Sequence, residues 1–239
     1  MIDIKFDISE LNKAERFLAV LSERNITFAV SKAMNASASF AREQLVDELR
    51  DKIDRPTRWT LGGTFASFAK ANNLETTIGL RTDPQASGNP AGRYLMPLIT
   101  GTRPRLKGAD LSATKISNGQ SNAVLIPARS AGLLDSYGNV PLRKQTQILS
   151  GLRAGRGYYV APVRKGSTTK AIFETSSGFL GRTSTLVSSR RRVFTIDPNP
   201  KTRQPTIRVQ ETLADAFRRR WNTELQTAME QELRRRLGG

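Results

Sequence analysis

Apolar residues recur along the chain with two different periods, and these periods separate predicted helices from predicted strands. Residues 2–8 alternate apolar and polar side chains, which predicts a half-buried strand. Residues 9–25 and 26–53 repeat apolar side chains every three to four positions, which predicts two helices that meet near Asn25. Alanine and serine crowd the middle of the second helix, so we expect another element to pack closely against it.

The middle of the chain has the pattern of short strands and turns. Residues 64–80 predict two strands around Asn72 and Asn73, and residues 93–100 form a short apolar helix or strand. A helix is expected over residues 141–153, with Pro141 at its first position. Further strands are predicted in four ranges: 122–128, 157–163, 170–175 and 191–198.

Residues 208–237 form the clearest helical pattern of the chain. Large apolar side chains recur there every four residues: Leu213, Phe217, Trp221, Leu225, Met229, Leu233 and Leu237. Each step of four residues overshoots a full turn by about 40°, so this stripe winds around the helix. We expect one end of the stripe to pack on the chain's own domain and the other on a neighbouring subunit. The alternative is a curved helix buried in its own fold.

Packing or subunit contacts are therefore predicted for five stripe residues: Phe217, Trp221, Leu225, Met229 and Leu233. A second anchor is predicted in the segment "YLMPLITGTRPR", where an apolar run ends at Gly101 and three cations follow. Four side chains of this run are expected to hold it on the core: Tyr94, Leu95, Leu98 and Ile99. Gly101 would then let the chain turn outward.

Positive charge is concentrated in one part of the sequence. The 239-residue chain has a formal net charge of +17, and residues 91–210 hold 20 Lys and Arg against 4 Asp and Glu, or +16 of it. Self-repulsion of this size favours a polyanionic neighbour. Taken singly, most of these cations could equally be solvated loop residues.

The chain contains neither cysteine nor histidine, which excludes thiol nucleophiles, Cys-based metal sites and histidine triads. The acids of the basic region, Asp110, Asp135, Glu174 and Asp197, are far apart in sequence. "GLRAGRG" lacks the Lys-Ser/Thr ending of a phosphate-binding loop. We therefore expect no enzyme activity, no cofactor and no metal. No run approaches 18 apolar residues, so no membrane span is expected.

The remaining interpretation is that cations in loops contact a phosphate backbone without reading the base sequence. Ten residues are predicted to face DNA or a partner: Arg103, Arg105, Lys107, Arg153, Arg156, Arg164, Lys165, Arg190, Arg191 and Arg192. Aromatic residues among them are few, which makes stacking on single-stranded bases the weaker option.

Four segments, in order, resemble the phage minor tail protein Z, or tail-completion (neck), family. The alanine-rich "FAVSKAMNASASFAREQL" resembles its opening helix, and "DRPTRWTLGG" is similar to the turn that follows. "YLMPLITGTRPR" and "LDSYGNVPLRKQTQILSGL" are similar to later family segments, and the closing basic helix fits as well. The resemblance covers most of the chain, although none of these motifs is catalytic.

This resemblance implies an α+β fold in which long N-terminal and C-terminal helices pack on a small antiparallel sheet with extended basic loops. It implies a single domain over residues 1–239, with 105–190 as a basic, loop-rich insertion. The implied function is structural: a ring, most simply a hexamer, around the DNA channel at the head-proximal end of a phage tail.

The partners implied are further copies of the chain, the tail terminator, head–tail connector proteins and genomic DNA, with the tape measure protein as a further candidate. The implied location is the virion, after assembly in the host cytoplasm, and no membrane is involved. The alternative function is a nucleic-acid-binding protein that contacts phosphates without sequence specificity.

Overall fold

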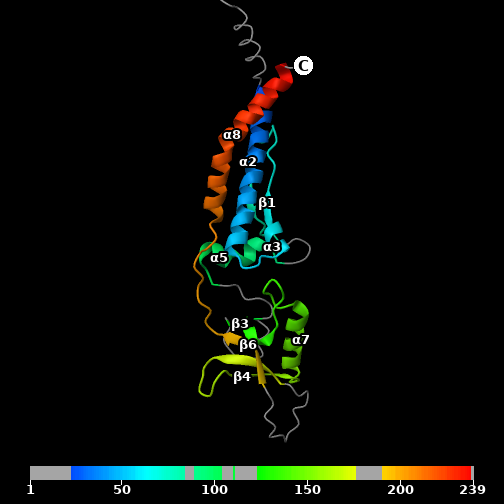
Figure 1. Ribbon diagram of the computed structural model, residues 1–239, viewed down its shortest axis with the longest axis vertical. Coiled ribbons are helices and arrows are strands. Elements are labelled where there is room, and N and C mark those ends of the chain that lie inside the picture. The colour runs from blue at the N-terminus through cyan, green and yellow to red at the C-terminus, as the bar shows by residue number, and fades with distance from the viewer. Residues whose placement is uncertain (1–22, 84–88, 104–109, 111–122, 176–189, 238–239) are drawn as a thin grey trace, which may run out of the picture. The chain divides into compact units, whose positions relative to one another are not determined.

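Two long helices, a two-stranded hairpin and a four-stranded sheet form most of the described chain (Figure 1). The computed structural model describes residues 23–83, 89–103, 110, 123–175 and 190–237. The α+β class is confirmed. The predicted strand 2–8 and nearly all of the predicted helix 9–25 lie outside the described residues.

The chain forms two compact units. Unit 1 contains the described residues of Met1–Ile53, Arg58–Arg93 and Ile207–Gly239. Unit 2 contains Asp54–Thr57 and the described residues of Tyr94–Thr206, which include most of the basic region. The single domain over 1–239 stays a prediction.

Unit 1 is organised by helices α2 (Glu23–Lys52) and α8 (Val209–Leu237), which lie side by side (Figure 1). The buried residues of α2 form a row with a spacing of four: Ala29, Ala33, Ser37, Ala41, Leu45 and Leu49. On α8, Ala216, Ala228 and Glu232 are buried with the same spacing. Rows of this period interdigitate in the commonest class of helix packing. The small residues of this row, toward the N-terminal end of α2, let the backbone of α8 approach closely.

Helix α8 packs on α2 at both of its ends. Near the start of α8, Thr212 Oγ1 donates a hydrogen bond to Glu48 of α2. Near its end, the Arg235 guanidinium lies 5.4 Å from the Phe28 ring centroid. The expected contact of one end of α8 with a neighbouring subunit stays a prediction. Helix α2 begins at Glu23, three residues before the predicted start at residue 26, and the residues before it lie outside the described chain.

Enlarging a small residue in this seam should destabilise unit 1. Ala33 is 1% exposed and packs in one cluster with Ala228. We expect Ala33→Leu to lower the free energy of unfolding by about 1–3 kcal/mol, because the seam has no space for three more carbons. Urea denaturation followed by circular dichroism measures this. Ala214→Leu, at an exposed position of α8, is the matched control and should be nearly neutral; equal losses in both variants would contradict the close packing.

The rest of unit 1 lies along α2 and at its C-terminal end. Helix α3 (Arg58–Gly62) leads into the hairpin of β1 (Thr64–Ala66) and β2 (Ile78–Leu80), which confirms the predicted pair of strands. Asn35 of α2 holds this hairpin by two hydrogen bonds with the backbone of Ala69, at 2.7 and 3.0 Å. Helix α4 (Ala91–Tyr94) follows β2.

Unit 2 contains a four-stranded antiparallel sheet in the order β3-β6-β5-β4. Its strands are β3 (Val124–Pro127), β4 (Tyr158–Pro162), β5 (Lys170–Thr175) and β6 (Arg190–Asp197), which confirms the four predicted strands. Helix α7 (Leu142–Arg153) covers one face with Ile148, Leu149 and Leu152. Pro141 is the N-cap of α7 and not its first helical residue. The core between helix and sheet includes Ile172, Phe194 and Ile196.

The outer edge of β3 is closed to further strands. The backbone N–H of Leu125 donates to Asp110 Oδ1 at 2.8 Å, and Asp110 itself is 5% exposed. Pro127, two residues later on the same edge, has no N–H to offer. Blocked donors of this kind disfavour pairing of a strand edge with a neighbouring chain.

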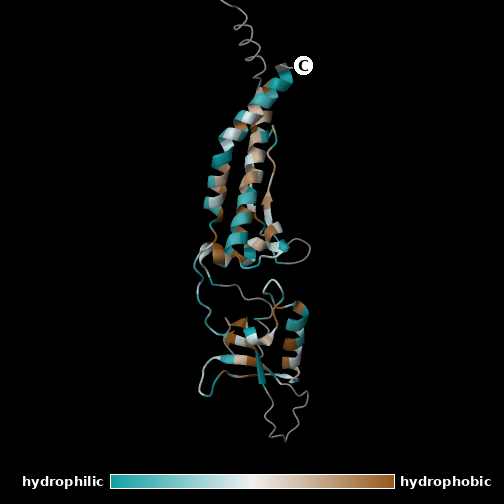
Figure 2. Cartoon of the chain, viewed as in Figure 1, coloured by the Kyte–Doolittle hydropathy of each residue, from teal (hydrophilic) through white to brown (hydrophobic). Residues whose placement is uncertain are grey.

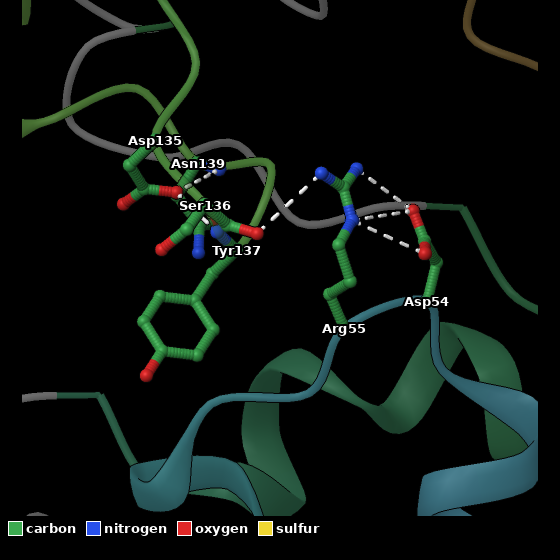
Figure 3. Close-up of polar contacts among 6 residues, drawn as sticks. All are labelled: Asp54, Arg55, Asp135, Ser136, Tyr137 and Asn139. Atoms are coloured by element: carbon green, nitrogen blue, oxygen red, sulfur yellow. Dashed lines mark hydrogen bonds and ion pairs between the residues drawn. The ribbon is translucent and has the colours of Figure 1, made fainter.

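A polar turn of unit 2 joins the segment after α2 to the loop before α7 (Figure 3). Arg55 has a φ of 50°, which lies outside the right-handed helical region that a following proline such as Pro56 disfavours. Its guanidinium donates to Asp54 Oδ2 at 2.9 Å and to the Ser136 carbonyl at 3.4 Å. The Asp135 carboxylate caps the turn by accepting from two backbone N–H groups, those of Tyr137 and Asn139.

Candidate polyanion-binding surface

A β-bulge decides where the arginines of β6 point. The register shifts between Ile172 and Phe173 of β5, where Phe194 faces Ile172 and Arg192 faces Phe173, so that Val193 is the extra residue. Val193 and Phe194 are both in the core under α7. Alternation then places Arg190 and Arg192 on the opposite face of the sheet and Arg191 on the α7 side. This hydrophilic start of β6 is visible in Figure 2.

Arg191 is used to hold the sheet together. Its Nε donates to Glu174 Oε2 at 2.9 Å, and its Nη1 donates to the carbonyl of Ala131 at 3.3 Å. The other oxygen of Glu174 accepts from the Tyr158 hydroxyl at 2.9 Å. Burial and this hydrogen bond raise the pKa of Tyr158, so the phenol stays a neutral donor. Three arginines of β6 were predicted to face DNA or a partner. Of these, Arg191 is already bound to other residues of unit 2.

Removing the Arg191 side chain should lower the stability of the fold and leave binding to a polyanion unchanged. We expect Arg191→Ala to lower the free energy of unfolding by about 1–2 kcal/mol, because Glu174 and Ala131 lose a charged donor in a partly exposed site. Thermal melting measures the loss. Arg192→Ala is the control, since among the described residues the Arg192 side chain has no hydrogen bond or ion pair, and its melting should be unchanged. A larger loss for Arg192→Ala would contradict this assignment.

The fold brings Arg153 and Arg156 to the same end of the sheet as the start of β6. Both are exposed and lie where α7 ends and β4 begins. This turn is adjacent to β5, because the N–H of Thr175 donates to the Gly157 carbonyl at 2.9 Å. Thr175 in turn pairs with Arg190. Two strand spacings, about 10 Å, therefore separate the backbone of Gly157, which follows Arg156, from that of Arg190.

We call this set the arginine end of the sheet: Arg153, Arg156, Arg190 and Arg192. Of the four acids in residues 91–210, Glu174 is the one at this end, and it is bound to Arg191. Asp197 lies at the other end of β6, and Asp110 accepts from β3 near it. Positive charge here is thus not neutralised by described carboxylates.

Other predicted cations do not join this group. Arg164 and Lys165 are exposed in the turn between β4 and β5, at the opposite end of the sheet. Arg103 is exposed just after Gly101, whose φ of 72° confirms the expected turn. Arg105 and Lys107 lie outside the described residues.

The face that carries Arg190 also carries an aromatic pair. The rings of Tyr159 and Phe173 stack with centroids 5.7 Å apart, and the Arg190 guanidinium lies 5.1 Å from the Phe173 centroid. Phe173 is only 5% exposed, so it cannot receive a nucleic-acid base. The pair instead holds Arg190 in place by a cation–π contact. Sequence patterns missed this role because Phe173 lies on a different strand.

The residues predicted as anchors are buried or half-buried in the structure. Helix α5 (Met96–Thr100) follows Leu95, which is 4% exposed, while Tyr94, Leu98 and Ile99 are half-buried. The Leu98 carbonyl accepts from the N–H of Thr206 at 2.7 Å. The five stripe residues of α8 are half-buried, and Phe217 stacks on Trp221 at 5.8 Å. Their role in subunit contacts stays a prediction.

Unit 1 contains a cavity of about 330 Å³ that the sequence did not indicate. Trp59 forms one wall, and its Nε1 donates to the Asn89 carbonyl at 3.1 Å. Arg58, Arg81 and Asp83 add charges of both signs. Three separate segments build this cavity, namely residues 58–63, 81–83 and 90–91, so no single motif could mark it.

Within the described ranges, no three acidic residues are close enough to hold a metal ion. No helix in the same part of the chain is long and apolar enough to cross a membrane. The predictions of no enzyme activity and no cofactor stay predictions. The chain matches no protein-family profile, no curated protein sequence and no solved structure.

Proposed function

We propose that this chain is a structural virion protein at the head-proximal end of a phage tail, where copies form a ring and the arginine end of each sheet faces DNA. The observation that carries the proposal is the gathering of Arg153, Arg156, Arg190 and Arg192 at one end of unit 2. The resemblance of the sequence to the tail-completion family supports the location at the end of a phage tail. The clustered positive charge supports the contact with DNA.

The chemistry of these arginines suits a DNA backbone. Arg190 and Arg192 lie two residues apart on one face of one strand, so their backbones are about 7 Å apart. Guanidinium groups bind phosphate oxygens well and remain charged at every relevant pH.

Immunolabelling of purified tailed particles tests the location. Antibody against the chain should mark the head–tail junction in electron micrographs, and particles that lack the chain should have tails separated from heads. Absence of the chain from purified particles would overturn the proposal. The location test does not depend on any single arginine.

The alternative, a free nucleic-acid-binding protein, is favoured by the same arginine end. The two functions differ in what the isolated monomer does. A free binder should hold duplex DNA tightly as a monomer, with strong salt dependence. A ring protein should bind weakly as a monomer and gain affinity on assembly, because each copy then adds its own contacts.

A further inference from the structure

The outer edge of β4 is the second border of the four-stranded sheet, opposite the border formed by β3. Just before β4, the N–H of Thr175 donates to the Gly157 carbonyl at 2.9 Å. Just after it, the N–H of Val163 donates to the Thr169 carbonyl at 2.9 Å. Hydrogen-bonded pairs alternate along an antiparallel ladder. Two residues of β4 therefore direct their backbone groups toward β5: Tyr159 and Ala161.

The other three residues of β4 direct their backbone groups away from the sheet: Tyr158, Val160 and Pro162. They present three carbonyl acceptors but only two N–H donors, because proline has no N–H. Within the described ranges, no group accepts a hydrogen bond from the N–H of Tyr158 or Val160. An edge with open donors and acceptors is a template for an added strand.

Cations lie beyond both ends of this edge. Arg156 is exposed in the turn before β4, and Arg164 and Lys165 are exposed in the turn after it. The two turns, "RAGRG" and "RKGSTT", contain no acid. The nearest acid of the adjacent strand, Glu174, already accepts a hydrogen bond from Arg191. An acidic segment laid along β4 would therefore meet a cation at each of its ends.

A second copy of β4 fits this edge poorly. Antiparallel pairing of two β4 strands would bring Arg156 of one copy beside Arg164 and Lys165 of the other. Parallel pairing would place each of these cations beside the same cation of the other copy. Like charges directly opposite one another on paired strands are destabilising. The charge pattern therefore favours an occupant that carries carboxylates.

The edge also sets the length and pattern of this occupant. Strand β4 has five residues, which extend over about 17 Å, and Arg156 and Arg164 lie two positions beyond its ends. A segment of nine residues therefore covers the strand and reaches both cations. Tyr158 and Val160 pack against the core under α7, so apolar side chains suit that face of an added strand. β-Branched residues fit such a half-buried strand best.

We propose that the outer edge of β4 binds an extended acidic segment of a partner protein as an added strand. Carboxylates at the two ends of the segment lie beside Arg156 and Arg164, and β-branched side chains lie between them. This inference goes beyond the proposed function and requires neither DNA binding nor a ring. It accounts together for the open backbone groups of β4 and for the cations at both of its ends.

A labelled peptide, Glu-Asp-Val-Thr-Val-Thr-Val-Asp-Glu, tests the proposal by fluorescence anisotropy with the full-length protein. Val160→Pro should weaken peptide binding about tenfold, because it removes an outward N–H and fills the position of the partner carbonyl with a ring. Val160→Thr is the matched control, since it keeps the N–H and the β-branched shape, and it should bind the peptide as the unaltered protein does.

The fold should tolerate Val160→Pro, because proline is accepted on edge strands where the N–H faces outward. Thermal melting checks this. A second measurement uses the unaltered protein alone: the same peptide with N-methyl groups on its five central residues keeps its charge but cannot donate to β4. It should bind about tenfold more weakly than the unmethylated peptide. A peptide with lysine at the four acidic positions should not bind.

Three results would overturn the proposal. Absence of peptide binding, or equal affinities of the methylated and unmethylated peptides, would exclude strand addition. Dimers of the unaltered protein that dissociate in Val160→Pro, measured by sedimentation, would assign the edge to a second copy. Weaker binding of duplex DNA by Val160→Pro, which keeps every arginine, would assign the edge to the DNA surface. Unchanged DNA affinity in this variant keeps the two proposals separate.

Discussion

Replacing both Arg190 and Arg192 by alanine is expected to weaken binding of the full-length protein to duplex DNA about 60-fold at 0.1 M salt. Each phosphate contact contributes about 0.9 to the slope of log affinity against log salt, so losing two should flatten that slope by about 1.8. Arg190 and Arg192 are exposed and on the face away from α7. Fluorescence anisotropy over a salt series measures both quantities.

The matched control for this pair is Arg164→Ala with Lys165→Ala. It removes the same number of exposed charges from the same sheet, but from its other end. If the arginine end binds DNA, the control should keep the slope of the unaltered protein. Equal slopes in the two double variants would show that binding depends on net charge alone, and the arginine end would lose its special role.

Replacing Phe194 by alanine should be the most destabilising single change in unit 2. Phe194 is 1% exposed and lies between the sheet and α7 with Ile172 and Leu149. Removing its ring leaves a cavity in a small core, so we expect a loss of about 3–5 kcal/mol in the free energy of unfolding. Urea titration followed by near-ultraviolet circular dichroism measures this.

Leu142→Ala is the control for the core change, because Leu142 is in the same unit and 76% exposed. We expect it to change the free energy of unfolding by less than about 0.5 kcal/mol. Losses of similar size in the two variants would mean that Phe194 is not a core residue. Such a result would also question the bulge, since the bulge puts both Val193 and Phe194 under α7.

Most helices and strands of this protein could be predicted from the sequence, because each carries its own period. The alanine row of α2 and the strand patterns around Tyr159 and Phe194 depend only on neighbours in sequence. What local patterns left open was pairing between distant segments. The winding stripe of α8 did not identify α2 as its partner within unit 1, because the matching row of buried residues lies far away in the sequence.

The candidate site shows the same limit. Sequence composition placed the excess charge within residues 91–210, but it treated Arg190, Arg191 and Arg192 alike. Their separation depends on one extra residue in β6 and on Glu174 in the neighbouring strand. Such information lies in the register between strands, which no local pattern contains. For the same reason, Arg153 and Arg156 could not be assigned to the same end of the sheet as the start of β6.

The occupied or missing N–H groups on the outer edge of β3 matter where many copies of a protein are packed closely. Proteins held in many copies within a few nanometres risk joining sheet to sheet into fibres, because backbone groups pair without regard to side chains. With Asp110 occupying the N–H of Leu125 and a proline two positions on, that route is disfavoured on this side of unit 2. In an assembly of the proposed kind, contacts at this edge would depend on side chains, which mutation can change one at a time.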